Sequence, residues 1–296
     1  MNFLVIGHSV VDKIKEERCI STKPGGIFYT VVSLLGQKSF DDNLFLCSSI
    51  DKESGELFEA AYNQIERDFI TAVDSIPTVE LVVNKTGERN ETYSKIGSNL
   101  KLPSDLRRFD GILINMITGY DISLSQMKQL RKDFKGLIYF DVHTLSRGVD
   151  DNMNRVFRRI EAFNEWAECV DILQANESEL MTLSHNTSEA DILNELFSYG
   201  IKQIIITKAE KGATVYFNSG IEIKRIHKDA IRVNAKNKIG CGDVFGAVYF
   251  YNYIKNKNVT LALEQANLFA GVATTLSSTE EFLNLKRYAN EWISKK

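Results

Sequence analysis

The residues whose types and spacing suggest chemistry lie at 237–250, with the sequence NKIGCGDVFGAVYF. Gly240 and Gly242 stand just before an apolar helical pattern, where glycine permits a positive φ and lets a ligand approach the main chain. The first amides of a helix have no partner within it, and the helix dipole favours negative charge at that end. The pattern therefore predicts an anion site, for which phosphate is the usual occupant.

Asp243 stands at the mouth of this expected site. A carboxylate repels a bound phosphate, but it is well suited to take a proton from a hydroxyl that attacks a phosphoryl group. The alternative is structural, because Gly240-Cys241-Gly242-Asp243 could be a tight turn with Asp243 as a helix N-cap. Short glycine motifs match often by chance, so these residues alone leave both interpretations open.

The composition excludes several classes of protein. The chain has 296 residues, of which 44% are hydrophobic and 25% charged, as in ordinary globular proteins with a substantial core. Lys and Arg number 36 against 39 Asp and Glu, with no basic run, so nucleic acid and anionic membranes are not expected partners. The four cysteines are scattered without a CxxC motif, which favours a reducing compartment and argues against zinc. With neither a signal peptide nor a membrane-length apolar run, we expect a cytoplasmic protein.

These residues must be positioned by elements that alternate between apolar runs and helical patterns, which favours a mostly parallel sheet covered on both faces. Strands are predicted at residues 3–6, 44–49, 69–73, 111–116, 136–142, 172–175, 203–207, 213–217, 222–225 and 230–233. Helices are predicted at 27–35, 55–66, 124–134, 151–169, 188–199, 243–255, 260–276 and 281–293. Because no repeat or low-complexity linker interrupts this order, we expect one α/β domain over residues 1–296.

Residues 78–96 differ from this alternation. Two runs with polar alternation flank residues 84–87 (NKTG), which is typical of a β-hairpin. A hairpin inside a βα chain predicts a small β lid, with lid elements near residues 12–24 and 78–98. Asp12 follows the first predicted strand, at the end where open α/β sheets bind ligands, although Asp12 taken alone is somewhat better interpreted as a turn residue.

Four features fall at strand ends or turns in a fixed order: Gly25-Gly26, Asn176-x-x-Glu179, the TKAEKG sequence at 207–212, and Gly240-x-Gly242-Asp243. Together they resemble the ribokinase-like (PfkB-type) carbohydrate kinase family over nearly the whole chain. The resemblance implies a three-layer α/β sandwich with a mostly parallel central sheet and a small β lid. It also implies an ATP- and Mg²⁺-dependent kinase that acts on a hydroxyl of a small sugar, polyol or nucleoside.

The resemblance further implies a role for each matched residue. Asp243 would be the general base, and the amides of Gly240, Cys241 and Gly242 would form the anion hole. The nucleotide would be bound by Asn176, Thr207, Gly212 and Asn267, with Asn267 beside the adenine. Glu179 would act on Mg²⁺, through one of the waters that this ion gives up reluctantly. The residues facing the acceptor substrate, under the lid, would be Asp12, Gly25, Gly26 and His143.

Several of these residues also have plain structural interpretations. Glu179 could be a solvated acid in the first turn of a helix, and Asn267 a polar residue on a helix surface. His143 could be a structural or exposed histidine. Arg147 could bind a phosphate of the substrate, or it could be a solvated loop arginine.

The chain also departs from the family pattern. Asn237 stands where the family often has Asp, and Lys238-Ile239 where it usually has two threonines, so activation by a monovalent cation is in doubt. Ala209 replaces a frequent glycine, and residues 27–30 (IFYT) replace a segment that commonly carries a sugar-binding Asn. These departures support an alternative, a catalytically silent nucleotide- or sugar-binding regulatory protein on the same fold. The lid edges could also pair with a second copy in a homodimer.

Overall fold

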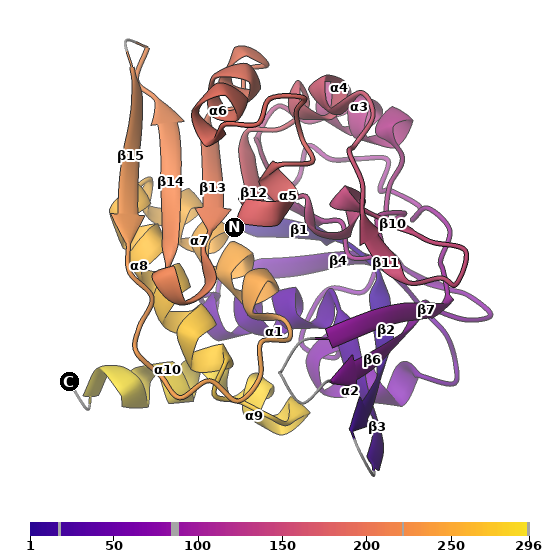
Figure 1. Ribbon diagram of the computed structural model, residues 1–296. Helices are drawn as coiled ribbons and strands as arrows, with labels where there is room; N and C mark the ends of the chain where they lie inside the picture. Colours follow the sequence, from indigo (N-terminus) through magenta and orange to yellow (C-terminus); the bar gives the residue numbers. More distant parts are fainter. Residues whose placement is uncertain (17–18, 84–88, 221, 295–296) are drawn as a thin grey trace.

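The computed structural model describes residues 1–16, 19–83, 89–220 and 222–294, which form an α/β core around a nine-stranded sheet (Figure 1). The strand order is β15-β14-β13-β12-β9-β8-β1-β4-β5. The parallel strands are β1 (Asn2–Ile6), β4 (Asn43–Ile50), β5 (Ile70–Ala72), β8 (Gly111–Asn115), β9 (Leu137–Asp141), β12 (Ile172–Asn176) and β13 (Gln203–Thr207). The antiparallel strands β14 (Ala213–Asn218) and β15 (Ile223–Lys228) extend the sheet at one edge.

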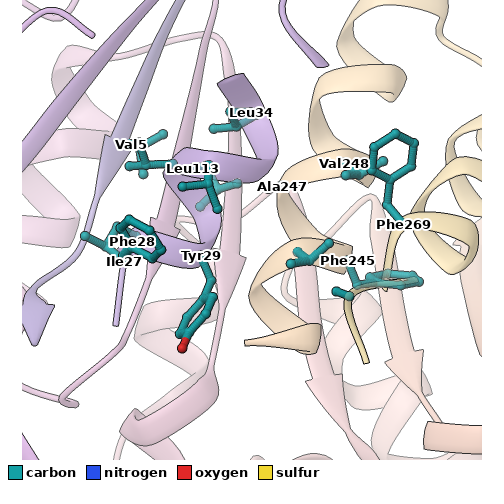
Figure 2. Close-up of a cluster of buried hydrophobic side chains, with 14 of the residues drawn as sticks. Val5, Ile27, Phe28, Tyr29, Leu34, Leu113, Phe245, Ala247, Val248 and Phe269 are labelled. Carbon is teal, nitrogen blue, oxygen red and sulfur yellow. The ribbon is translucent and has the colours of Figure 1, made fainter. Parts of the chain in front are cut away.

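Helices cover both faces of this sheet, because its central strands are apolar on both sides. One face carries α1 (Phe28–Gln37), α2 (Gly55–Tyr62), α7 (Cys241–Asn256), α8 (Val259–Ala273), α9 (Thr279–Leu283) and α10 (Leu285–Ser294). The other face carries α3 (Leu124–Asp133), α4 (Phe163–Ala167), α5 (Glu177–Leu180) and α6 (Glu189–Ser198). Successive residues of a strand point to opposite faces, so Leu113 and Ile114 belong to different core clusters. Figure 2 shows side chains of α1, α7 and α8 gathered with Val5 and Leu113 of the sheet.

A smaller four-stranded sheet, the lid, projects from one side of the core (Figure 1). Its strands, in the order β3-β2-β6-β7, are β2 (Ser9–Glu16), β3 (Cys19–Gly26), β6 (Thr78–Val83) and β7 (Arg89–Lys95). The predicted hairpin turn at 84–87 lies outside the described residues. A short pair from the core, β10 (Arg147–Val149) and β11 (Arg155–Phe157), lies against β7, where the Tyr93 amide donates to the Met153 carbonyl over 3.0 Å. This contact joins β7 of the lid to the segment between β10 and β11 of the core.

The structure corrects several predicted elements. Residues 151–169 do not form one long helix, because residues 155–157 pair with β10 and only Phe163–Ala167 are helical. Residues 230–233 form no strand, since Ile231 packs closely over Gly271 of α8 and does not extend the sheet. The predicted last helix is divided at Asn284, the C-cap of α9. Asp12 lies inside β2, neither at the end of β1 nor in a turn.

Several short elements complete the fold. They are the 3₁₀ turns η1 (His143–Ser146) and η2 (Ala209–Lys211), together with isolated bridges, of which one joins Phe45 to Glu66 beyond the end of α2 and another joins Thr92 of β7 to Asn154. Within the described ranges, none of the helices combines the length and apolar character needed to cross a membrane. The carboxyl ends of the parallel strands, where ligands bind in open α/β sheets, face the lid, and the cleft described next lies there.

Candidate active site

The glycine loop before α7 agrees with the sequence prediction at Gly240, whereas Gly242 is the second residue of α7 and has no positive φ. Gly240 is the N-cap residue of α7 with φ +73°, and a Cβ there would come within 2.3 Å of the Tyr29 ring. Glycine is therefore required for both backbone conformation and close packing. The loop borders a cleft of about 1020 Å³, which Gly240, Cys241, Gly242 and Asp243 all line. The start of a 16-residue helix thus borders a space large enough for small-molecule ligands.

Asp243 is buried in the first turn of α7, with its side chain 7% exposed. Its Oδ1 accepts a hydrogen bond from Asn115 Nδ2 over 2.7 Å and lies 4.0 Å from His143 Nε2. Burial raises the pKa of Asp243 to about 7, and the charge of Glu179 adds to this effect, while the Asn115 hydrogen bond opposes it. A carboxyl group with a pKa near neutrality is suited to exchange protons with a hydroxyl in the cleft.

Two further carboxylates lie close enough to influence Asp243 electrostatically. The Asp141 side chain, at the end of β9, has its pKa raised well above the usual range by burial and by the charges of Glu179 and Asp243. Gln174 Nε2 donates to Asp141 Oδ2 over 2.7 Å and to the Gly242 carbonyl over 3.2 Å. The amide oxygen of Gln174 accepts from the Tyr139 hydroxyl. This network fixes the glycine loop against the strand ends.

Asn176 and Glu179 form a reciprocal cap at the start of α5. Asn176 Oδ1 accepts from the Glu179 amide over 2.9 Å, and Glu179 Oε2 accepts from the Asn176 amide over 2.8 Å. Glu179 is only 6% exposed, so its interpretation as a solvated acid is wrong. Burial raises the pKa of Glu179 to about 7, against the hydrogen bonds from Asn176 and the charge of Arg147. The predicted pair thus has a structural role at the edge of the cleft.

The cleft contains three buried carboxyl groups, whose chemistry indicates whether a cation could bind there. Asp141, Glu179 and Asp243 are each less than a tenth exposed. The charge of Glu179 raises the pKa values of both Asp141 and Asp243, and the charge of Asp243 raises the pKa of Asp141. A divalent cation would favour the charged forms, so the chemistry of this set fits Mg²⁺. No three His, Cys, Asp or Glu side chains among the described residues are close enough to hold a metal directly. An ion here would therefore be held partly by water and by a bound phosphate.

The wall formed by β13, η2 and α8 brings together the predicted nucleotide-binding residues. Thr207 ends β13, and Gly212 follows η2 with φ +90°, where a Cβ would lie 2.0 Å from the Lys228 carbonyl. Asn267 is buried on α8, and its Nδ2 donates to that same carbonyl over 2.9 Å. Its interpretation as a surface polar residue is therefore wrong. All three line the cleft.

The lid side of the cleft contains the residues predicted to face an acceptor. Asp12, Gly26 and His143 line the cleft; His143 is the first residue of η1, with φ +35°, and its Nε2 lies 4.0 Å from Asp243. The pKa of His143 is lowered by burial and by the charges of Arg155 and Arg147, so the imidazole is neutral. Gly25 is not among the lining residues; a Cβ there would lie 2.2 Å from Asp12 Oδ2, so Gly25 provides room for that carboxylate.

Two residues of the site were not found from the sequence. Asn115 is the last residue of β8, and Gln174 lies within β12; each is a buried polar side chain in an otherwise apolar strand. A polar residue near the carboxyl end of a buried strand was the only available signal, since such strands end at the ligand-binding edge. Asn115 Oδ1 is buried without a hydrogen-bond partner among the described residues, which leaves an acceptor available beside Asp243.

Comparison with known proteins places these features in context. A family model described as pfkB family carbohydrate kinase matches residues 144–285. The deoxyribokinase of Salmonella typhi is 31% identical over 99 residues, which cover 33% of this chain and 31% of that protein. The match therefore spans about a third of the curated relative's length.

Solved structures resemble the chain over nearly its full length. A putative ribokinase II from E. coli, in complex with ATP and Mg²⁺, has a TM-score of 0.76 at 16% identity, covering 100% of this chain and 99% of its own. A pyrophosphate-dependent kinase of the ribokinase family, complexed with a pyrophosphate analogue and myo-inositol, has a TM-score of 0.75 at 15% identity, covering 96% and 100%. The predicted ribokinase-like fold, with its mostly parallel sheet, is confirmed.

Proposed function

We propose that this chain, which matches the pfkB carbohydrate kinase family over residues 144–285 and has the ribokinase-like fold, transfers a phosphoryl group from ATP to a hydroxyl of a small sugar, polyol or nucleoside. The observation that supports this proposal most directly is the buried Asp243 in the first turn of α7, within a cleft that the start of this helix also lines. These two features suit a reaction in which a hydroxyl loses its proton while negative charge develops on a phosphoryl group.

In the proposed reaction, the acceptor hydroxyl lies beside Asp243 and attacks the terminal phosphorus of the donor in line with the leaving oxygen. The new O–P bond forms as the bond to the leaving ADP breaks, and the hydroxyl proton passes to Asp243. Asn115 orients the carboxylate through its 2.7 Å hydrogen bond. The amides of Cys241 and Gly242, held by the Gly240 turn, would stabilise charge on the transferring group.

Magnesium would be held next to Glu179 and the phosphates through water, and it would neutralise charge on the donor. Asn176, Thr207 and Gly212 would bind the nucleotide along the opposite wall, with Asn267 near the base. Asp12 and Gly26 would face the acceptor, and His143 would hydrogen-bond one of its hydroxyls as a neutral imidazole. The lid would exclude water, which otherwise competes as the acceptor.

The test is release of ADP from Mg-ATP by the purified protein over a panel of sugars, polyols and nucleosides. Asp243→Asn should retain the fold and nucleotide binding but lose about 10²-fold or more of the acceptor-dependent turnover. Asp68→Asn provides a matched control, because Asp68 is 61% exposed and lies outside the cleft. A second series with pyrophosphate as donor addresses the other donor seen among the structural relatives.

Three results would contradict the proposal. They are a wild-type turnover number in Asp243→Asn, equal losses in Asp243→Asn and Asp68→Asn, and ATP binding without transfer to any acceptor. The last result would favour a silent binding protein on the same fold.

A further inference from the structure

One face of the β10–β11 pair forms part of the cleft wall on the lid side. Arg147 is directly opposite Phe157 in the register of the pair, and Arg155 is two residues from Phe157 on the same strand. Because side chains alternate between the faces of a strand, these three residues share a face. All three line the cleft, together with Glu91 of the lid. Two guanidinium groups therefore stand side by side at the place where the lid meets the core.

Arg155 is held firmly but retains an unused donor. Its side chain is 8% exposed, with Nη1 donating to Glu91 Oε2 over 2.6 Å and Nη2 donating to the Tyr93 hydroxyl over 2.6 Å. The guanidinium also stacks on the Tyr93 ring at 4.5 Å. Its Nε is buried and has no acceptor among the described residues. A buried donor of this kind is costly unless a ligand supplies the acceptor.

Arg147 is oriented but incompletely neutralised. Its guanidinium lies over the Phe157 ring at 4.7 Å, which holds its planar fork in one orientation. Its Nη1 is 3.5 Å from the same Glu91 oxygen that Arg155 binds at 2.6 Å, so one carboxylate oxygen is shared by two cations. The side chain is 28% exposed, which leaves it accessible from the cleft. A planar guanidinium with spare donors matches the oxygens of a phosphate or carboxylate.

These arginines line the same cleft as Asp243, Glu179 and His143. The charge of Arg155 acts on Asp243, and the charge of Arg147 acts on Glu179 and His143. Apolar side chains of the lid, Val79 and Leu81, also line this cleft. A single small molecule could therefore place one hydroxyl at Asp243 and a second group at the arginines.

We propose that the acceptor carries an anionic group, a phosphate or a carboxylate, that is bound by the guanidinium of Arg147 and Nε of Arg155. The substrate class is then a sugar or polyol phosphate, or a sugar acid, with the anion away from the hydroxyl that is phosphorylated. This inference rests on the proposed function, since it assumes that the lid side of the cleft receives the acceptor. It makes Arg147 a specificity-determining residue.

The first experiment measures binding without any phosphoryl donor, so that it does not depend on catalysis. Thermal unfolding of the protein is followed with matched pairs: ribose and ribose 5-phosphate, fructose and its 1- and 6-phosphates, glucitol and gluconate. We expect an anionic member to raise the melting temperature more than its neutral partner. The phosphate and carboxylate pairs distinguish the two sources of the anion.

Variants then assign the preference to its residues. Arg147→Met should weaken binding of the preferred anion about 10- to 100-fold, as expected for loss of a charge-assisted pair, and should abolish the preference over the neutral partner. Arg147→Lys keeps the positive charge but loses the paired N–H donors of the planar guanidinium, so it should bind the anion more tightly than Arg147→Met and less tightly than the wild type. Arg158→Met removes an exposed arginine from just beyond β11 and should leave the preference unchanged.

The proposal is wrong if no anionic compound binds better than its neutral partner, or if the preference survives in Arg147→Met. It is also wrong if Arg147→Met lowers kcat equally for neutral and anionic acceptors, because Arg147 would then act on the transferring phosphoryl group. Anion-selective binding that depends on Arg147, without any ADP release, would refute the proposed kinase activity and leave the anion site standing. The two failures are thus distinguishable.

Discussion

Asn115 at the end of β8 donates a 2.7 Å hydrogen bond to Oδ1 of Asp243 at the start of α7, across 128 residues of sequence. This bond favours the charged form of the carboxyl group, whereas burial and the charge of Glu179 favour the neutral form. The pKa of about 7 for Asp243 is the balance of these effects. Changing either neighbour should therefore move that pKa in a known direction.

The first prediction concerns the pH dependence of turnover. If Asp243 must be ionised to accept a proton, kcat should rise with pH through about 7. Asn115→Ala removes the hydrogen bond to the carboxylate and should shift this rise to higher pH. Glu179→Gln removes a like charge and should shift it to lower pH, while Gln can still cap α5. Profiles of kcat from about pH 5 to 9 measure both; shifts in the same direction would contradict the assignment.

The second prediction concerns stability. Because the folded-state pKa of Asp243 is raised, its contribution to stability is fully present below its ordinary pKa and is lost as pH rises through about 7. Asp243→Asn should therefore change stability little near pH 4 and raise the free energy of unfolding near pH 8, on the order of 1–4 kcal/mol. Urea denaturation at both pH values checks this. The exposed control Asp68→Asn should show no such difference, and an equal effect at both pH values would be a contrary result.

The third prediction concerns Gly240, where glycine is required both for a positive φ and for close packing against Tyr29. Gly240 and Gly200 both have positive φ, +73° and +94°, but only Gly240 packs against a side chain, that of Tyr29. Gly200→Ala, with no atom within 4 Å of the new Cβ, should cost about 1 kcal/mol for the backbone alone. Gly240→Ala should cost more and should lower kcat by about 10-fold or more, because the start of α7 must shift. Denaturation and steady-state kinetics of both variants give the comparison, and equal costs with unchanged kcat would refute it.

The fourth prediction concerns Ala209, which has φ +49° at the start of η2, where the family often has glycine. Ala209→Gly removes the steric strain of a left-handed conformation from the folded state, which stabilises it. Glycine also increases the conformational entropy of the unfolded chain, which opposes this gain. The net effect should be a free energy of unfolding that is unchanged or higher by up to about 1 kcal/mol. Ala60→Gly, on the exposed side of α2, should instead be destabilising by about 1 kcal/mol. The same sign for both changes would be inconsistent with strain at Ala209.

The parts of the site that could be predicted are those set by local sequence. The positive φ of Gly240, the helix that follows it and the Asn176-x-x-Glu179 cap depend on neighbouring residues, and the structure contains all of them, although α7 begins at Cys241, two residues before the predicted start. Asn115 and Gln174 were missed because their partners, Asp243 and the Gly242 carbonyl, are distant in sequence. Only the assembled sheet brings these groups to one edge.

The wrongly predicted helix at 151–169 has a similar cause. Its residues have a helical pattern of polar and apolar side chains, but pairing with β10 and contacts with the lid override that pattern. The buried Glu179 is another such case, since burial depends on elements that surround α5 and not on its own turn. Where the local sequence pattern is ambiguous, tertiary contacts therefore determine which secondary structure forms and which side chains are buried.

The reciprocal cap of Asn176 and Glu179 also bears on how the family can diverge. Because these side chains begin α5 whatever the cleft contains, a descendant without catalysis would still be selected to keep this spacing for folding. Asp243 is under the opposite pressure, since its buried charge lowers stability at neutral pH and only a chemical role favours its retention. In a set of homologues, loss of the carboxylate at position 243 should therefore mark inactive lineages earlier than any change at 176 or 179.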